Sequence, residues 1–213
     1  MKPATIEAIK ALCDSKNPRA LQGWGWLDKT LTMARYVETE KPKICLGIGI
    51  FGGRTMVPMA LQCRDNGFGV VYGVDPWTNP AALEGEHKPE DSKWWGAVNL
   101  FSVMIKFMGQ IEQLGLIDIA IPIRATSQAI AGIFPPESID ILDIDGNHSE
   151  LASLRDIDLY YPKVRSGGLI WLDDTDGERW PTNQAAVRKL ESLCTRVLVV
   201  SGTEGHCTLY RKP

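Results

Sequence analysis

Hydrophobic and polar positions along the chain follow the pattern of an α/β protein. Short apolar runs typical of buried strands alternate with longer amphipathic stretches typical of helices. The predicted strands occupy 44–50, 70–74, 118–123, 139–144, 169–172, 196–200 and 206–211. The first five alternate with helices, which predicts a parallel arrangement, whereas the last two flank a glycine-containing loop at 201–205 and predict an antiparallel hairpin.

The predicted helices lie between these strands, and two more precede the first strand. They cover 5–14, an aromatic-rich stretch from Trp24 that Lys41-Pro42-Lys43 stops, 56–66, 93–114, a short segment ending near 133, 150–161 and 183–194. The stretch 93–114 is expected to be one long amphipathic helix with Trp94 and Trp95 in the core. The polar, proline-containing segment 79–92 is expected to be an exposed loop and a candidate lid over a ligand crevice.

Length and composition predict one soluble domain of 213 residues, with a helical cap at 1–40 and a core at 41–213. A net charge of −3 and a pI of 5.7 provide no basic surface for nucleic acid. No apolar run approaches the ~20 residues of a membrane span, and the amphipathic N-terminus lacks the apolar region of a signal peptide. The five scattered cysteines contain no C-x-x-C pair and suggest reduced thiols. We therefore expect a cytoplasmic protein that binds neither nucleic acid nor membrane.

Acidic residues follow two predicted strands that should be neighbours in the sheet. Asp145 follows 139–144, and Asp173 and Asp174 follow 169–172. The carboxyl ends of parallel strands face the ligand crevice of an open α/β sheet, so these three carboxylates should converge. Carboxylates so close together repel unless a cation lies among them, and a hard divalent ion such as Mg²⁺ prefers oxygen ligands. The alternative is that they only end strands and cap the next helices.

The strand at 44–50 is followed by a glycine-rich turn and then by the helix at 56–66. Gly49, Gly52 and Gly53 allow the backbone to turn sharply and to pass close to a ligand. The N-terminal amides of the following helix would point at the same place. Residues 47–52 also match the dinucleotide pattern G-x-G-x-x-G, which alone is a weak signal.

Polar residues also follow the second and third predicted strands. Asp75, after 70–74, stands where a nucleotide ribose is usually held, although it is also a turn-former before Pro76. Thr126 and Ser127 follow the strand at 118–123, where they would contact a base or cap the next helix. Both interpretations remain open for these residues.

Together these features resemble the class I S-adenosylmethionine-dependent methyltransferases. That resemblance implies a Rossmann-like, seven-stranded, mostly parallel sheet with helices on both faces and an antiparallel last strand. The segment 49–55 is similar to the family's glycine turn, and 74–77 to its ribose-binding strand end. The segments 144–148 and 171–174 are similar to the metal-binding strand ends of small-molecule O-methyltransferases. The most similar subgroup contains natural-product sugar O-methyltransferases and the so-called cephalosporin hydroxylases.

The resemblance implies S-adenosyl-L-methionine as cofactor and Mg²⁺ or Mn²⁺ as metal. The cofactor would contact Gly49, Ile50, Phe51, Gly52, Arg54, Thr55, Asp75, Trp77, Thr126, Ser127 and Asp145. The metal would be held by Asp145, Asp173 and Asp174. One departure is Gly47, because the family usually has an acidic residue at this position.

His148 lies three residues after Asp145 and is the candidate base. It would take the proton of a hydroxyl on a small-molecule acceptor, a sugar or another natural product. A helix cap and a fourth metal ligand are the alternatives for this residue. For the whole chain, the alternatives are an NAD-dependent oxidoreductase and a non-catalytic cofactor-binding protein, and a homo-oligomer is left open.

Overall fold

The computed structural model describes residues 1–202 and 205–213. The strands are β1 Ile44–Ile48, β2 Val70–Val74, β3 Ala120–Ile123, β4 Ile139–Ile144, β5 Val164–Leu172, β6 Thr195–Gly202 and β7 Gly205–Arg211. The α-helices are α1 Pro3–Cys13, α2 Leu27–Glu40, α3 Met56–Asn66, α4 Asn79–Ala82, α5 Pro89–Ala97, α6 Leu100–Gln113, α7 Ser127–Ile130, α8 Glu150–Tyr160 and α9 Gln184–Leu193. Three 3₁₀ turns are η1 Ala131–Ile133, η2 Tyr161–Lys163 and η3 Pro181–Asn183.

The strands form one seven-stranded sheet in the order β3-β2-β1-β4-β5-β7-β6. Strands β1 to β5 pair in parallel, and β7 runs antiparallel to both β5 and β6. The predicted sheet with an antiparallel last strand is therefore confirmed. The strand order reverses between β1 and β4, and in such sheets this switch point is where ligands bind.

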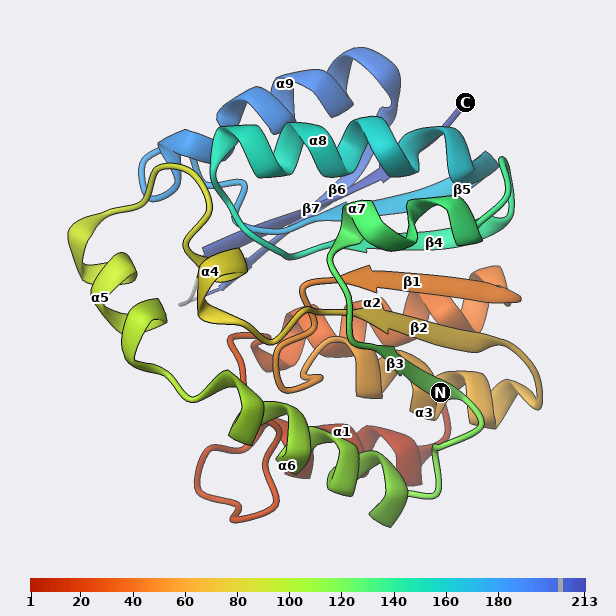
Figure 1. Ribbon diagram of the computed structural model, residues 1–213. Coiled ribbons are helices and arrows are strands. Elements are labelled where there is room, and N and C mark those ends of the chain that lie inside the picture. The colour runs from red at the N-terminus through yellow and green to blue at the C-terminus, as the bar shows by residue number, and fades with distance from the viewer. Residues whose placement is uncertain (203–204) are drawn as a thin grey trace.

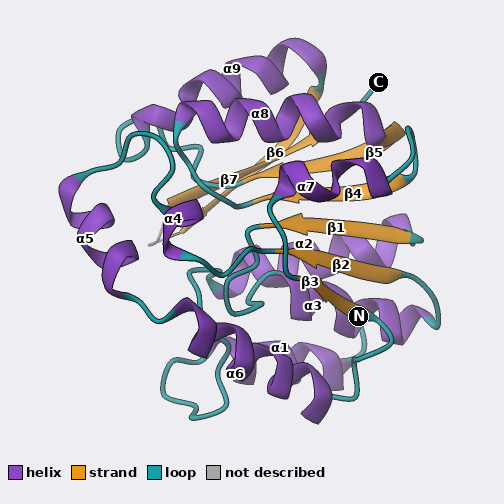
Figure 2. Cartoon of the chain, viewed as in Figure 1, coloured by secondary structure: helices purple, strands orange, loops and turns teal. Residues whose placement is uncertain are grey.

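Helices cover both faces of the sheet (Figures 1 and 2). Helices α1, α2, α3 and α6 share one apolar core with the sheet, while α7, α8 and α9 share the other. The central strands β1 and β4 are mainly apolar because each contributes residues to both cores. In β4, for example, Ile141 packs with the first core and Leu142 with the second.

The long helix predicted at 93–114 is wrong, because two helices occupy this stretch. Helix α5 ends at Ala97, Val98 is extended, and the side chain of Asn99 caps α6 by accepting a hydrogen bond from the Ser102 amide at 3.0 Å. The apolar spacing continues across this break, so the pattern alone did not reveal it. Trp94 was also wrongly predicted as core, since it is 42% exposed.

The segment 79–92 contains more regular structure than the predicted exposed loop. It holds α4 and the start of α5, and each helix has a proline in its first turn. A proline there begins a helix rather than breaking one, because the first helical amides need no acceptor within the helix. The prediction of a pure loop was therefore wrong, while the role of this segment as a lid stays a prediction.

Other differences from the predicted elements are small. Strand β1 ends at Ile48, β3 begins at Ala120, β5 begins earlier at Val164, and α2 begins at Leu27, after the aromatic stretch that starts at Trp24. Of the hairpin loop predicted at 201–205, the outer residues belong to β6 and β7, and 203–204 lie outside the described residues.

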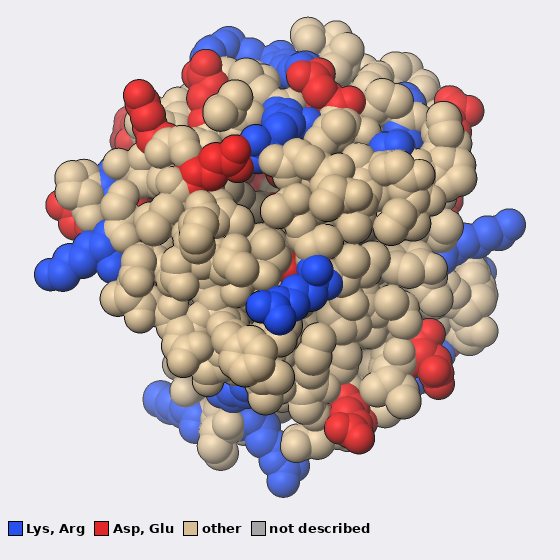
Figure 3. Space-filling view, in the orientation of Figure 1, with Lys and Arg blue, Asp and Glu red and all other residues tan. Residues whose placement is uncertain are grey.

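Two surface properties bear on the expected partners. Within 1–202 and 205–213, no helix has the length and apolar character needed to cross a membrane. On the face seen in Figure 3, Lys and Arg side chains are interspersed with Asp and Glu, and most of the face is uncharged.

Candidate functional site

A cavity of about 490 Å³ lies at the carboxyl ends of the central strands. It is lined by the last residues of two strands, Ile48 of β1 and Val74 of β2, and by the residues that follow two others, Asp145 after β4 and Asp173 after β5. The cavity is therefore at the switch point between β1 and β4, where the crossovers diverge to opposite faces and leave an open crevice.

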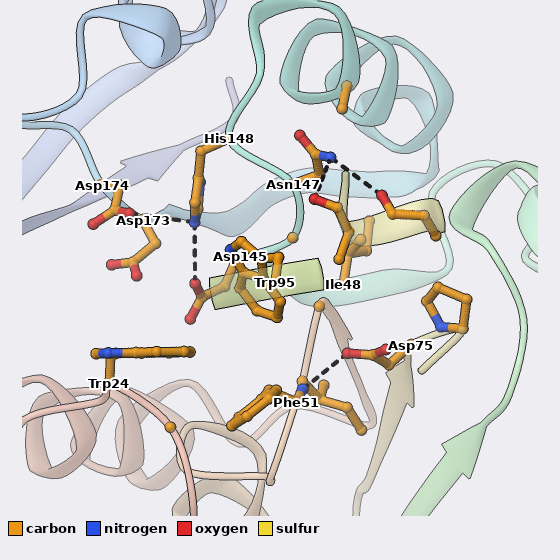
Figure 4. A pocket seen from close by; sticks show the side chains of 18 of the residues that line it. Trp24, Ile48, Phe51, Asp75, Trp95, Asp145, Asn147, His148, Asp173 and Asp174 are labelled. Atoms are coloured by element: carbon orange, nitrogen blue, oxygen red, sulfur yellow. Dashed lines mark hydrogen bonds and ion pairs between the residues drawn. The ribbon is translucent and has the colours of Figure 1, made fainter. Parts of the chain in front are cut away.

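The acidic residues meet at one side of this cavity, as predicted (Figure 4). Parallel pairing of Ile144 with Leu172 brings the ends of β4 and β5 to the same level. Asp145, His148 and Asp173 each offer an atom within 4.8 Å of the other two. Asp174 lies beside them, with Oδ2 3.3 Å from His148 Nε2.

His148 belongs to this group through its imidazole and takes no part in capping α8. The cap is Ser149, whose side chain accepts a hydrogen bond from the Ala152 amide. His148 Nε2 lies 3.8 Å from Asp145 Oδ1. The helix-cap alternative is therefore excluded, and the histidine is placed to act as a base or as a metal ligand.

Lys29 is the residue in this cluster that the sequence analysis missed. It extends from α2, is fully buried, and places its Nζ 3.0 Å from Asp145 Oδ2 and 2.8 Å from Asp173 Oδ2. Burial alone would lower the pKa of Lys29, but the two carboxylates outweigh it and raise that pKa well above its usual value. A permanent positive charge therefore lies among the acids.

The two carboxyl groups that contact Lys29 have pKa values shifted in opposite directions. Burial and the neighbouring Asp173 raise the pKa of Asp145 well above its usual value. At Asp173, burial acts to raise the pKa, but Lys29, Asp145 and His148 together outweigh it and lower the pKa. Burial raises the pKa of Asp174 to about 6, against the opposing effect of His148.

The oxygen and nitrogen atoms of the acidic cluster that do not contact Lys29 are suitable ligands for a divalent cation. Lys29 uses Oδ2 of both aspartates, which leaves Oδ1 of Asp145 beside the imidazole of His148. Oδ1 of Asp173 is buried and has no hydrogen-bond partner among the described residues. Carboxylate oxygens with one imidazole are a suitable donor set for Mg²⁺ or Mn²⁺.

Replacing Lys29 by Met should destabilise the protein by about 3–5 kcal/mol, because two buried carboxylates lose their cation. Urea unfolding at neutral pH measures this loss, and Lys106→Met on the exposed surface of α6 is the matched control. The loss should shrink as the pH falls, because protonation removes the negative charges that Lys29 no longer balances. A decrease in the free energy of unfolding of less than about 1 kcal/mol at neutral pH would contradict a stabilising role of Lys29 between the two aspartates.

At the other side of the cavity, Asp75 holds the glycine turn in place. Its Oδ2 accepts the Phe51 amide at 2.9 Å and its Oδ1 accepts the Trp77 amide at 2.7 Å. Burial raises its pKa, against these two hydrogen bonds. Asp75 therefore forms the turn and also lines the cavity, so the two interpretations from the sequence do not exclude each other.

The remaining sequence-predicted residues divide into two groups. Those lining the cavity are Gly49, Ile50, Phe51, Arg54, Thr55, Thr126 and Ser127. Gly52 and Trp77 do not line it: a Cβ on Gly52 would meet Gln22, and buried Trp77 donates its indole N–H to the Phe51 carbonyl at 2.8 Å. These two residues support the turn from behind.

The two polar residues after β3 have local partners. Thr126 caps α7 by accepting from the Ala129 amide, so the capping interpretation applies to it. Ser127 donates to Asp156 Oδ1 at 2.5 Å. Asp156 lines the cavity and was missed in the sequence, because it lies in the middle of α8, far from any strand end.

Gly47, where related proteins are expected to carry an acidic residue, lies beside an acidic residue of the neighbouring strand. Gly47 of β1 pairs in register with Asp143 of β4. Asp143 is buried, and burial raises its pKa to about 6. A carboxyl group is therefore present at this level of the sheet, but it comes from the adjacent strand.

The segment 79–92 is fastened across the cavity. Asn147 Nδ2 donates to the carbonyl of Glu84 at 2.8 Å, and the Glu84 carboxylate forms two hydrogen bonds with Arg155, at 2.7 and 2.6 Å. Lys88 Nζ donates to the Arg179 carbonyl at 2.7 Å. The segment is thereby tied to α8 on one side and to the chain after β5 on the other.

Comparisons with known proteins agree with this architecture. The model of a methyltransferase-domain family matches residues 46–175, which is more than half of the chain. A protein of Acanthamoeba polyphaga mimivirus is 44% identical over 64 residues, 27% of this chain and 29% of the viral protein. The chain thus matches under a third of the length of this curated relative.

Two solved structures illustrate the fold. The O-methyltransferase NovP aligns with a TM-score of 0.70 at 16% identity, covering 96% of this chain and 88% of NovP. The O-methyltransferase TomG from Streptomyces achromogenes, solved in complex with SAM, aligns with a TM-score of 0.62 at 15% identity, covering 100% of this chain and 90% of TomG. These similarities confirm the predicted Rossmann-like methyltransferase fold.

Proposed function

The chain belongs to this methyltransferase-domain family, and from that premise we propose that it is an S-adenosylmethionine-dependent O-methyltransferase that requires a divalent metal. Its acceptor would be a hydroxyl group of a small molecule. The observation that supports this most directly is the cluster of Asp145, His148 and Asp173 beside the glycine turn in one cavity. The residues that would activate the acceptor would thus lie next to those that would bind the cofactor.

S-adenosylmethionine, when bound, supplies a sulfonium methyl group whose carbon–sulfur bond breaks, with its electron pair left on sulfur, as the acceptor oxygen takes the carbon. The residues that would hold it are those around Gly49 and Phe51, with Asp75 at the ribose and Ser127 and Asp156 toward the base. Asp75 is pre-positioned for this role by its two backbone hydrogen bonds, each of which leaves a lone pair on the oxygen.

Asp145 and Asp173, with His148 or Asp174, would hold a divalent ion, which would supply Lewis-acid chemistry that lowers the pKa of an acceptor hydroxyl. The chain's own part is to hold the acceptor and remove its proton. His148 would accept that proton, because histidine is the usual general base near neutral pH. Asp174, 3.3 Å from the imidazole, would stabilise the charge that His148 gains.

Calorimetry with S-adenosylhomocysteine tests the cofactor assignment, and NAD is the control ligand for the oxidoreductase alternative. Asp75→Ala should weaken S-adenosylhomocysteine binding by about 1–3 kcal/mol, the effect of losing a hydrogen bond to a charged group. Asp75→Asn keeps only one of the two oxygens that accept backbone amides, and its affinity should fall between those of Asp75→Ala and the wild type. Unchanged affinity in Asp75→Ala would rule out the ribose placement.

A further inference from the structure

The segment 79–92, which we call the strap, approaches His148 in two ways. One is through Asn147, the residue before His148, whose side chain binds the strap. The other is through Lys88 of the strap, whose Nζ lies 5.4 Å from the centre of the Trp180 ring. Because His148 is the candidate base, both contacts bear on how its imidazole is held.

The amide nitrogen of Asn147 binds the end of α4 in the strap. This Nδ2 lies 3.2 Å from the carbonyl oxygen of Ala81, 3.3 Å from that of Ala82 and 2.8 Å from that of Glu84. The last carbonyls of a helix have no partner within the helix, so a donor from outside satisfies them. A helix as short as α4 is also not stable alone in water. The position of α4 therefore depends on Asn147.

The oxygen of the same side chain holds the backbone of His148. Asn147 Oδ1 accepts a hydrogen bond from the Ser149 amide at 2.9 Å, which closes a turn with His148 as its middle residue. Thr182 Oγ1 also donates to the His148 carbonyl at 2.8 Å. In the view of Figure 4, the interactions drawn from the Asn147 nitrogen run away from His148. One amide group thus holds the strap with its nitrogen and the base with its oxygen.

The imidazole of His148 is restrained by Trp180. The two ring centres lie 5.6 Å apart, and Lys88, which contacts the Trp180 ring, also donates to the Arg179 carbonyl at 2.7 Å. A second cavity of about 230 Å³ lies here, and His87, Lys88, Trp180 and His148 are among the residues that line it. The imidazole therefore has space into which it can rotate, and its contact with Trp180 limits that rotation.

The strap also forms part of the main cavity. Ala81, Ala82 and Glu84, whose carbonyls accept from Asn147, line this cavity together with Asn147 itself. A ligand that fills the cavity would therefore contact the strap at the place where Asn147 binds it. Occupancy of the cavity and placement of the base would depend on the same side chain.

Resting on the proposed function, we propose that Asn147 is a positioning residue, through which the docked strap holds His148 in the orientation that takes the proton of the acceptor hydroxyl. The placement of a base matters because a displacement of about 1 Å can lower a rate about 100-fold. Proton removal would then occur only while the strap is docked over the cavity.

Asn147→Ser tests this role, because a serine hydroxyl can still close the turn at Ser149 but is too short to reach the carbonyls of α4. The single-turnover rate with S-adenosylmethionine and a catechol acceptor should fall roughly 10–100-fold. Affinities for S-adenosylhomocysteine and for Mn²⁺ should fall far less than the rate, because Asp75, Asp145 and Asp173 are retained.

Two further variants complete the comparison. Asn17→Ser is the matched control, because Asn17 also donates to a carbonyl near a helix end and closes a turn with its oxygen, but does not line the cavity. It should leave the rate and the affinities unchanged. Lys88→Ala removes the contact with Trp180 from an exposed position of the strap and should lower the rate in the same direction as Asn147→Ser.

The NMR signals of the His148 imidazole provide a readout that does not depend on activity. The chain has three histidines, so comparison with His148→Ala assigns these signals. Spectra are recorded with and without S-adenosylhomocysteine. In Asn147→Ser the His148 ring signals should shift and narrow toward those of a freely rotating imidazole, while the His206 signals stay in place. Asn17→Ser should give the wild-type spectrum.

The outcomes distinguish this inference from the function on which it rests. Wild-type protein that binds no S-adenosylhomocysteine would overturn the proposed function, whereas spectra of the unbound protein would still test the link between Asn147 and His148. Unchanged His148 signals in Asn147→Ser would overturn the positioning role, as would a wild-type rate or a loss of cofactor affinity that accounts for the whole loss of rate. If catechol is not methylated, the signals alone decide, and if Asn147→Ser does not fold, Lys88→Ala decides by the same measurements.

Discussion

Methyl transfer should cease when divalent ions are removed with EDTA and return when Mg²⁺ or Mn²⁺ is added. The physical reason is charge: Asp145, Asp173 and Asp174 carry three negative charges when ionised, and Lys29 balances only one. The Asp173 oxygen without a hydrogen-bond partner among the described residues would gain one in the ion. Turnover is measured with S-adenosylmethionine and a catechol acceptor in chelated and metal-supplemented buffer.

Asp145→Asn provides the matching variant for this experiment, because it keeps the side-chain shape and removes one charge. It should lose activity and metal affinity together, while Asp118→Asn, at an exposed position just before β3, should behave as wild type. Full turnover in excess chelator, with no metal found by elemental analysis, would contradict metal dependence. In that case Lys29 would be the cation that holds the acids together.

His148→Ala should lower the rate by roughly 10²–10⁴-fold, the usual contribution of a general base. Cofactor affinity should be unchanged, because His148 lies on the acidic side of the cavity and away from Asp75 (Figure 4). Single-turnover kinetics measure the chemical step, and calorimetry with S-adenosylhomocysteine measures the affinity.

Metal affinity separates the two roles that the geometry leaves for His148. If it is the base, His148→Ala binds Mn²⁺ as the wild type does. If it is a ligand, Mn²⁺ affinity falls with the rate, since its Nε2 lies within reach of Asp145 and Asp173. A His148→Ala variant with near wild-type turnover would rule out both, and the proton would have to leave through water or a carboxylate.

The acidic residues at the strand ends could be predicted because the pattern that identifies them lies within a short stretch of sequence. An apolar run that ends in an acid identifies both the strand and the residue at its carboxyl end, so the convergence of Asp145 with Asp173 follows from the parallel order alone. The glycines after the first strand predicted the turn around Gly49, and the family resemblance assigned that turn to the cofactor. These predictions required no knowledge of side chains from distant parts of the chain.

Lys29 was missed because its role depends on contacts with residues far away in the sequence. The signal for Lys29 was present in its spacing, since it shares the buried face of α2 with Met33 and Val37. A charged residue on an apolar helix face needs an opposite charge, but the sequence does not tell which of many acids provides it. Trp94 was misplaced because α5 is a separate helix from α6 and this residue lines the cavity.

The pairing of Lys29 with Asp145 spans 116 residues and therefore has a consequence for biosynthesis. Lys29 leaves the ribosome long before Asp145 and Asp173, so α2 cannot bury its ammonium group until most of the chain has emerged. Until then the ammonium group of Lys29 must stay hydrated. Completion of the acidic cluster is thus a late, high-contact-order event, which makes the chain slow to close and vulnerable to proteases until its C-terminal strands arrive.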